Sequence, residues 1–196
     1  MKAVMISTQP KWVEKIASRK KTIEVRKTAP EVPVKAYIYC TKAKPYLYRE
    51  ANPPFELFLD NDLYEGEGYD DRLFSGKVIG EFICDKIIEW QYDKGHQYYV
   101  EYPDDCTSYF PYLKCHSEAT GLRCSEIENY GKGKTLYGWH ISDLKIYDKP
   151  KGLSEFRKPC KINLPMCDRC EYYSTWNGRC ENITRAPQGW CYVEEL

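Results

Sequence analysis

The alternation of polar and apolar residues predicts a chain built mostly of short strands. Six segments alternate, or are rich in β-branched and aromatic residues, as strands typically are: residues 3–7, 22–26, 35–41, 78–90, 136–141 and 144–147. Residues 9–16 and 125–130 have the pattern of short helices. Gly80, inside the longest strand segment, predicts a bulge or a close backbone approach. Together these elements predict an α+β fold, a small, partly open β-barrel with peripheral helices.

One predicted strand, residues 22–26, has a polar face that a core does not require. Successive side chains on a strand point to opposite faces, so Ile23 and Val25 lie together on a face that suits a core. Glu24 and Arg26 share the other face, which is charged and able to form hydrogen bonds. This face is therefore a candidate binding surface.

Length and composition suit one domain with a small appendage. The 196 residues divide at a break near residue 150, which predicts a domain over residues 1–150 and a Cys-rich tail over residues 151–196. Polar, irregular insertions are expected at about residues 42–76 and 91–119. No apolar run is long enough to span a bilayer, so a cytoplasmic location is expected.

Charge is balanced overall but unevenly distributed. Residues 11–35 carry eight basic and three acidic side chains, and residues 49–72 carry two basic and eight acidic ones. Solvated surface is the simpler interpretation of both runs, and two binding surfaces of opposite charge are the alternative. Eighteen Tyr and five Trp are many for this length, and aromatic rings serve either a core or the stacking of bases.

A family resemblance rests on the segment Lys20–Arg26. Its sequence, Lys-Lys-Thr-Ile-Glu-Val-Arg, resembles the G-x-K-T-x-E-x-R signature of ASCH domains, which belong to the PUA-like superfamily. Glu81 and the strand over residues 137–141 follow in the order that this family uses. The resemblance covers roughly residues 1–148 and implies a small β-barrel with a cleft between the first helix and the barrel.

The resemblance implies recognition of RNA or of a modified nucleotide. Seven residues are the expected ligand-binding set: Lys20, Lys21, Glu24, Arg26, Glu81, Tyr39 and Trp139. The planar fork of Arg26 suits a phosphate or a base edge, and the two aromatic rings suit stacking on a base. The alternatives are an ion network that only holds strands together and aromatic side chains that only pack in a core.

One branch of the superfamily resembles this chain at Lys21 and Glu81 and hydrolyses N4-acetylcytidine with a Lys, a Thr and a Glu. An amidohydrolase acting on N4-acylated cytidine is therefore the second hypothesis, although Glu24 stands where that branch has its Thr. Carboxylates near Lys21 favour the charged ammonium, which would orient a carbonyl or a phosphate while Glu81 activates a water. The third hypothesis is a phage-type inhibitor or adaptor that binds a protein through the acidic loop over residues 56–71.

The tail contains a candidate metal site. Cys167, Cys170, Cys180 and Cys191 follow a C-x2-C-x9-C-x10-C spacing, and four thiolates can enclose one structural zinc ion. A short tail with few apolar residues would gain stability from such a staple. Free thiols and disulfides are the alternatives, and a reducing cytosol disfavours disulfides.

Overall fold

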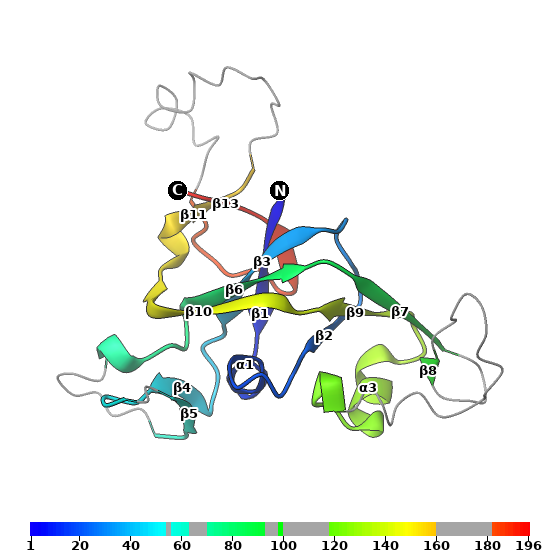
Figure 1. The fold of residues 1–196 in the computed structure, drawn as a ribbon, viewed down its shortest axis with the longest axis horizontal. Helices are drawn as coiled ribbons and strands as arrows, with labels where there is room; N and C mark the ends of the chain where they lie inside the picture. Colours follow the sequence, from blue (N-terminus) through cyan, green and yellow to red (C-terminus); the bar gives the residue numbers. More distant parts are fainter. Residues whose placement is uncertain (54–55, 63–69, 93–97, 100–117, 160–181) are drawn as a thin grey trace, which may run out of the picture.

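The computed structural model describes residues 1–53, 56–62, 70–92, 98–99, 118–159 and 182–196 (Figure 1). Strands dominate this part of the chain. The larger sheet has the order β10-β6-β3-β1-β12, with the bounds Ser142–Lys151, Val78–Cys84, Val34–Cys40, Ala3–Thr8 and Trp190–Tyr192. The second sheet has the order β2-β9-β7-β8, with the bounds Ile23–Arg26, Leu136–His140, Ile87–Tyr92 and Tyr98–Tyr99.

The two sheets share chain segments. Only residues 85 and 86 separate β6 from β7, and only residue 141 separates β9 from β10, so both segments run from one sheet into the other (Figure 1). The smaller elements include two strand pairs, β4 (Tyr46–Arg49) with β5 (Leu57–Asp60) and β11 (Phe156–Arg157) with β13 (Glu194–Glu195). They also include the helices α1 (Pro10–Ala17) and α3 (Cys124–Gly131) and the short 3₁₀ turns η1 (Asp70–Arg72) and η2 (Leu153–Glu155).

The predicted strands and helices are present, with two refinements. The segment over residues 78–90 divides into β6 and β7. The expected insertion at 42–76 contains the β4–β5 hairpin, while much of the predicted acidic loop and most of the expected insertion at 91–119 lie outside the described residues. The close backbone approach predicted at Gly80 is confirmed, because a Cβ there would lie 2.4 Å from the carbonyl oxygen of Lys145.

The expectation of a partly open β-barrel holds only in part, because the described strands do not form a closed barrel. In the described part of the chain the strands form open sheets, with β10 and β12 at the edges of the larger sheet and β2 and β8 at the edges of the smaller one. Closure would need backbone pairing between edges. β1 already pairs with β3 and β12, and a side chain makes its contact with β2, because Arg26 on β2 donates to the carbonyl oxygen of Ser7 on β1.

The main core lies between the larger sheet and α1. Val13 and Ile16 of α1 are fully buried against the inward residues of β1 and β3, among them Ile6 and Ile38. Burying a side chain of this size contributes about 1.5–3 kcal/mol. Trp12 is not among the buried residues of α1, and it lines the cavity described in the next section.

The end of the chain is built into the larger sheet. β12 pairs with β1 in antiparallel register, and Ile183 and Val193 are buried against the outer face of that sheet. The expected separate tail is therefore, over residues 182–196, part of the same packed unit as β1. Among the described residues, no helix has the length and apolar character needed to cross a membrane.

The segment 160–181 is predicted to be replaceable without loss of the fold. Its flanking residues are already held together, because Arg157 and Asn182 form a bridge and the Ile183 amide donates to the Phe156 carbonyl at 2.7 Å. A linker of about two or three Gly and Ser residues should therefore close the chain, since with residues 158 and 159 it makes a loop within the common hairpin range of 2–5 residues. Thermal unfolding followed by circular dichroism should show a midpoint within about 3 °C of the full chain. A variant that fails to fold would instead show that the segment acts as a staple.

Candidate functional site

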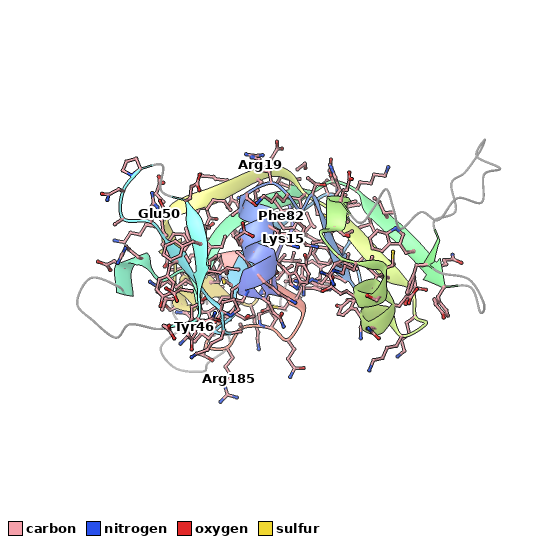
Figure 2. The ribbon with its side chains drawn as sticks, turned by 90° about the horizontal axis from the view of Figure 1, so that it is seen from below. Lys15, Arg19, Tyr46, Glu50, Phe82 and Arg185 are labelled. Carbon is pink, nitrogen blue, oxygen red and sulfur yellow. The ribbon has the colours of Figure 1, made fainter. Side chains whose placement is uncertain are left out.

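A cavity of about 810 Å³ lies beside the start of α1. Its walls come from the end of β1 and the start of α1, from β2, from the residues after β3, from α3 and from residues 186–188. Figure 2 shows α1 seen from below, between the β4–β5 hairpin and α3.

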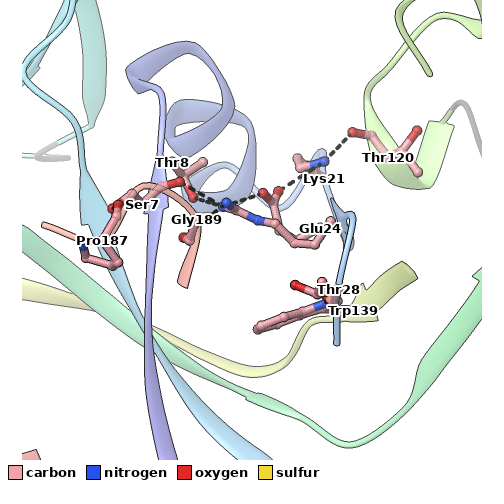
Figure 3. A network of polar contacts seen from close by, with 10 residues as sticks. Ser7, Thr8, Lys21, Glu24, Thr28, Thr120, Trp139, Pro187 and Gly189 are labelled. Carbon is pink, nitrogen blue, oxygen red and sulfur yellow. Dashed lines mark hydrogen bonds and ion pairs between the residues drawn. The ribbon is translucent and has the colours of Figure 1, made fainter. Parts of the chain in front are cut away.

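Three buried charges form the floor of this cavity. Glu24 is the central group, with its Oε2 atom 3.3 Å from Lys21 Nζ and its Oε1 atom 2.8 Å from Arg26 Nη2 (Figure 3). The side chains of Lys21, Glu24 and Arg26 are only 2 %, 8 % and 10 % exposed. Two cations thus share one carboxylate, and the network has a net charge of about +1 with all three groups ionised.

The Arg26 guanidinium links three separate segments. Its Nη2 atom donates to the Ser7 carbonyl oxygen and to Thr8 Oγ1, both at 2.9 Å, and its Nη1 atom donates to the Gly189 carbonyl oxygen at 3.3 Å (Figure 3). Its Nε atom is buried and has no hydrogen-bond partner among the described residues. The guanidinium therefore joins β2 to β1 and to the chain before β12.

Burial lowers the pKa of Lys21 below its ordinary value. Glu24 raises this pKa, while Arg26 and Lys15 lower it further, and burial is the largest effect. Lys21 Nζ also donates to the Thr120 carbonyl oxygen at 2.7 Å. The sequence argument expected nearby carboxylates to favour the ammonium, but in the folded chain one carboxylate does not offset the loss of water.

Trp12 is surrounded by ammonium groups. The Nζ atoms of Lys11, Lys15 and Lys21 lie 4.4, 4.9 and 5.7 Å from the centre of its ring. Distances under about 6 Å are typical of cation–π interactions. Lys15 also donates to the Gly121 carbonyl oxygen at 3.0 Å, whereas Lys11 is exposed beside the cavity.

Four of the predicted site residues come together at this cavity. Lys21, Glu24, Arg26 and Tyr39 all line it. Lys20 is exposed in the turn after α1 and does not line it.

Glu81 lies in a different environment. On β6 it accepts hydrogen bonds from Lys35 at 3.3 Å and from Tyr147 at 2.5 Å, and it does not line the cavity. Burial raises the pKa of Glu81, but the bonds from Tyr147 and Lys35 outweigh it, so the pKa lies below its ordinary value. The structure does not bring Glu81 together with Lys21.

Trp139 is a core residue. It is fully buried, its Nε1 atom donates to the Thr28 carbonyl oxygen at 3.2 Å, and its ring meets Trp190 edge to face at 5.5 Å between centroids. It does not line the cavity, so the aromatic wall there comes from other residues.

The metal prediction concerns residues that are mostly outside the described part of the chain. Cys167, Cys170 and Cys180 lie there, whereas Cys191 is a free thiol on β12. The described residues contain no group of three or more His, Cys, Asp or Glu side chains suited to a metal ion. Structural zinc therefore stays a prediction.

Sequence reasoning missed several residues that line the cavity, notably Trp12, Lys42, Tyr130 and Gln188. Trp12 had a usable signal, because it stands out of phase with the apolar face of its helix. Tyr130 is 39 % exposed, yet burial raises the pKa of its hydroxyl, with Arg26 lowering and Glu24 raising that pKa.

Comparison with known proteins establishes the fold. No family model matches the chain, and no curated protein matches it. A serine-to-alanine mutant of the ASCH protein from Zymomonas mobilis superposes with a TM-score of 0.52 at 14 % identity, covering 98 % of this chain and 88 % of that one. A tyrosine-to-phenylalanine mutant of the same protein gives 0.50 at 14 % identity, with coverage of 99 % and 91 %. The chain therefore has the fold of these ASCH structures.

The charge network predicts unequal effects of two substitutions on stability. Glu24→Gln leaves two buried cations without their carboxylate, which should lower the free energy of unfolding by about 3–5 kcal/mol. Lys21→Met leaves Glu24 paired with Arg26 and should cost less, about 1 kcal/mol for the lost bond to Thr120. Urea unfolding at pH 7 measures both, with exposed Glu128→Gln as the control. A Glu24→Gln cost no larger than that of the control would contradict the role given to Glu24.

Proposed function

We propose that this protein binds single-stranded RNA or a modified nucleotide in the cavity beside α1. The observation that carries the proposal is the cavity floor, where Lys21 and Arg26 are buried with the single carboxylate of Glu24 between them. An excess of buried positive charge attracts an anionic ligand, and the hydrogen-bonded guanidinium holds its orientation without the ligand.

Further basic residues stand where a phosphate would enter. Lys11 and Lys42 line the cavity, are exposed, and have no carboxylate partner among the described residues. Lys side chains of this kind bind phosphates as point charges. The cavity thus has a fixed, buried positive floor and adaptable cations at its edge, which suits a ligand with both a phosphate and a buried polar part.

Aromatic rings provide the remaining contacts. Trp12 and Tyr130 line the cavity with part of their surface exposed, and Tyr39 lines it while being 6 % exposed. Stacking of a base on such rings is worth about 1–3 kcal/mol. A volume of about 810 Å³ falls within the usual range for small-molecule sites.

A purely structural role explains the floor less well. Replacing a buried ion pair by apolar side chains is often neutral or stabilising, so stability alone does not favour keeping three buried charges. The lowered pKa of Lys21 shows that its burial opposes its charge. A bound anion would offset that cost, which is why ligand contact accounts better for the network.

Binding should depend strongly on salt. We expect a fluorescent ten-residue RNA to bind at low salt, with an affinity that falls as salt rises, because phosphate contacts release counterions. Lys11→Gln and Lys42→Gln should each weaken binding and reduce the slope of log affinity against log salt by about 0.7. Fluorescence anisotropy measures this, and Lys149→Gln, exposed on β10, is the matched control. Absence of binding at low salt, or equal slopes for all variants, would contradict the proposal.

A second function, hydrolysis of an N4-acylated cytidine, is supported by one observation. The pKa of Lys21 is lowered by burial, which increases the fraction of neutral amine able to act as a general base. Glu24, 3.3 Å away, is the nearby carboxylate, and Glu81 lies outside the cavity. A reaction at this site would therefore depend on Lys21 and Glu24.

Acetate release from N4-acetylcytidine tests this second function. If Lys21 is the base, Lys21→Ala and Lys21→Arg should both abolish release, because Arg stays protonated in proteins. The rate should rise with pH as Lys21 loses its proton, at a pH below 10.5 because the pKa is lowered. Lys20→Ala, an exposed neighbour, should keep full activity. A wild-type chain that releases no acetate from acylated cytidines would remove this function.

A further inference from the structure

One wall of the cavity comes from the far end of the chain. Residues 186–188 line the cavity, although β1 and β2, which they face, are formed from the first residues of the sequence. We call residues 182–189 the return segment, since they bring the chain back to the larger sheet before β12.

The return segment is fixed at the cavity by hydrogen bonds. The Ser7 amide donates to the Gly189 carbonyl oxygen at 3.0 Å, and Ser7 Oγ donates to the Pro187 carbonyl oxygen at 2.6 Å. Arg26 adds the bond to Gly189 at 3.3 Å. The wall and the charged floor therefore form one hydrogen-bonded unit (Figure 3).

Both ends of the return segment are anchored as well. At its start, Ile183 is buried and its amide donates to the Phe156 carbonyl oxygen at 2.7 Å. At its end, the Trp190 indole donates to Thr28 Oγ1 at 2.8 Å, and Trp190 pairs with Ile6 between β12 and β1. A wall held in this way has a defined position, which selective contacts require.

Gln188 presents an unengaged carboxamide from this wall. Its side chain is exposed, lines the cavity and has no hydrogen-bond partner among the described residues. The same is true of the side chains of Gln9, at the start of α1, and Asn129, on α3. Three separate walls therefore each offer a neutral group that both donates and accepts hydrogen bonds.

We propose that Gln188 is a specificity-determining residue of the cavity and that its carboxamide reads the hydrogen-bonding edge of a nucleobase. This inference rests on the proposed nucleotide binding. The cationic floor attracts any nucleotide equally, because phosphate is common to all of them. Discrimination requires neutral donors and acceptors at fixed positions, and a carboxamide matches the paired donor and acceptor of a base edge.

The test compares three ten-residue oligonucleotides, oligo-uridylate, oligo-cytidylate and oligo-adenylate, by fluorescence anisotropy. Wild-type protein should bind the best of them about tenfold more tightly than the worst, as one good base-edge contact allows. Gln188→Ala should reduce that ratio at least about threefold by weakening the best ligand, in line with the loss of one or two hydrogen bonds. Because Gln188 is exposed, its substitution should not affect folding.

Two control variants separate selection from general binding. Lys42→Gln should weaken all three oligonucleotides alike and leave their ratio unchanged, since it removes a phosphate contact. Asn52→Ala, an exposed amide that does not line the cavity, should change nothing. A wild-type chain that binds none of the three would overturn the proposed function and this inference together. Equal wild-type binding of all three, or a Gln188→Ala variant that keeps the full ratio, would overturn the inference alone.

Discussion

The Arg26 guanidinium is the interaction on which the arrangement of this molecule depends. A β-barrel joins neighbouring strands by continuous backbone pairing. Here β1 pairs with β3 and β12, and β2 pairs with β9, so no ladder joins β1 to β2 in the described part of the chain. The Arg26 side chain links these two strands through Ser7 and Thr8. Its third contact, to Gly189, holds the last part of the chain at the same point. One side chain thus links a strand of each sheet to the return segment, and Arg26 also lines the cavity.

Burial of Arg26 requires a counter-charge, and Glu24 supplies it from the same strand. The i and i+2 positions of a strand share one face, so Glu24 and Arg26 meet at 2.8 Å without any long-range packing. Lys21 then shares the same carboxylate, and the desolvation that lowers its pKa is the cost of that arrangement. Solvent and salt screen exposed charges strongly but screen buried pairs much less, so the excess positive charge of this network is only weakly screened. It therefore acts on whatever enters the cavity.

The sequence predicted the parts of this site that depend on local periodicity. Glu24 and Arg26 were placed on one face because strand periodicity is two, and that geometry holds in any fold. Glu81 and Trp139 were assigned from motif order and residue type, which do not determine which side of a sheet borders a cavity. In the structure Glu81 bonds to other partners and Trp139 packs in the core. Gln188 had no local signal, because its position depends on a chain reversal far from β1 in sequence.

In the proposed function, the charged floor of the cavity attracts the nucleotide and the neutral wall residues distinguish one base from another. The floor consists of charges that contact one another, and bonds from Arg26 to Ser7, Thr8 and Gly189 and from Lys21 to Thr120 also hold them in place. The walls include parts of α1, α3 and the return segment, and their neutral amide side chains have no hydrogen-bond partner among the described residues. Substituting a wall residue does not disturb a buried ion network, whereas substituting a floor residue does.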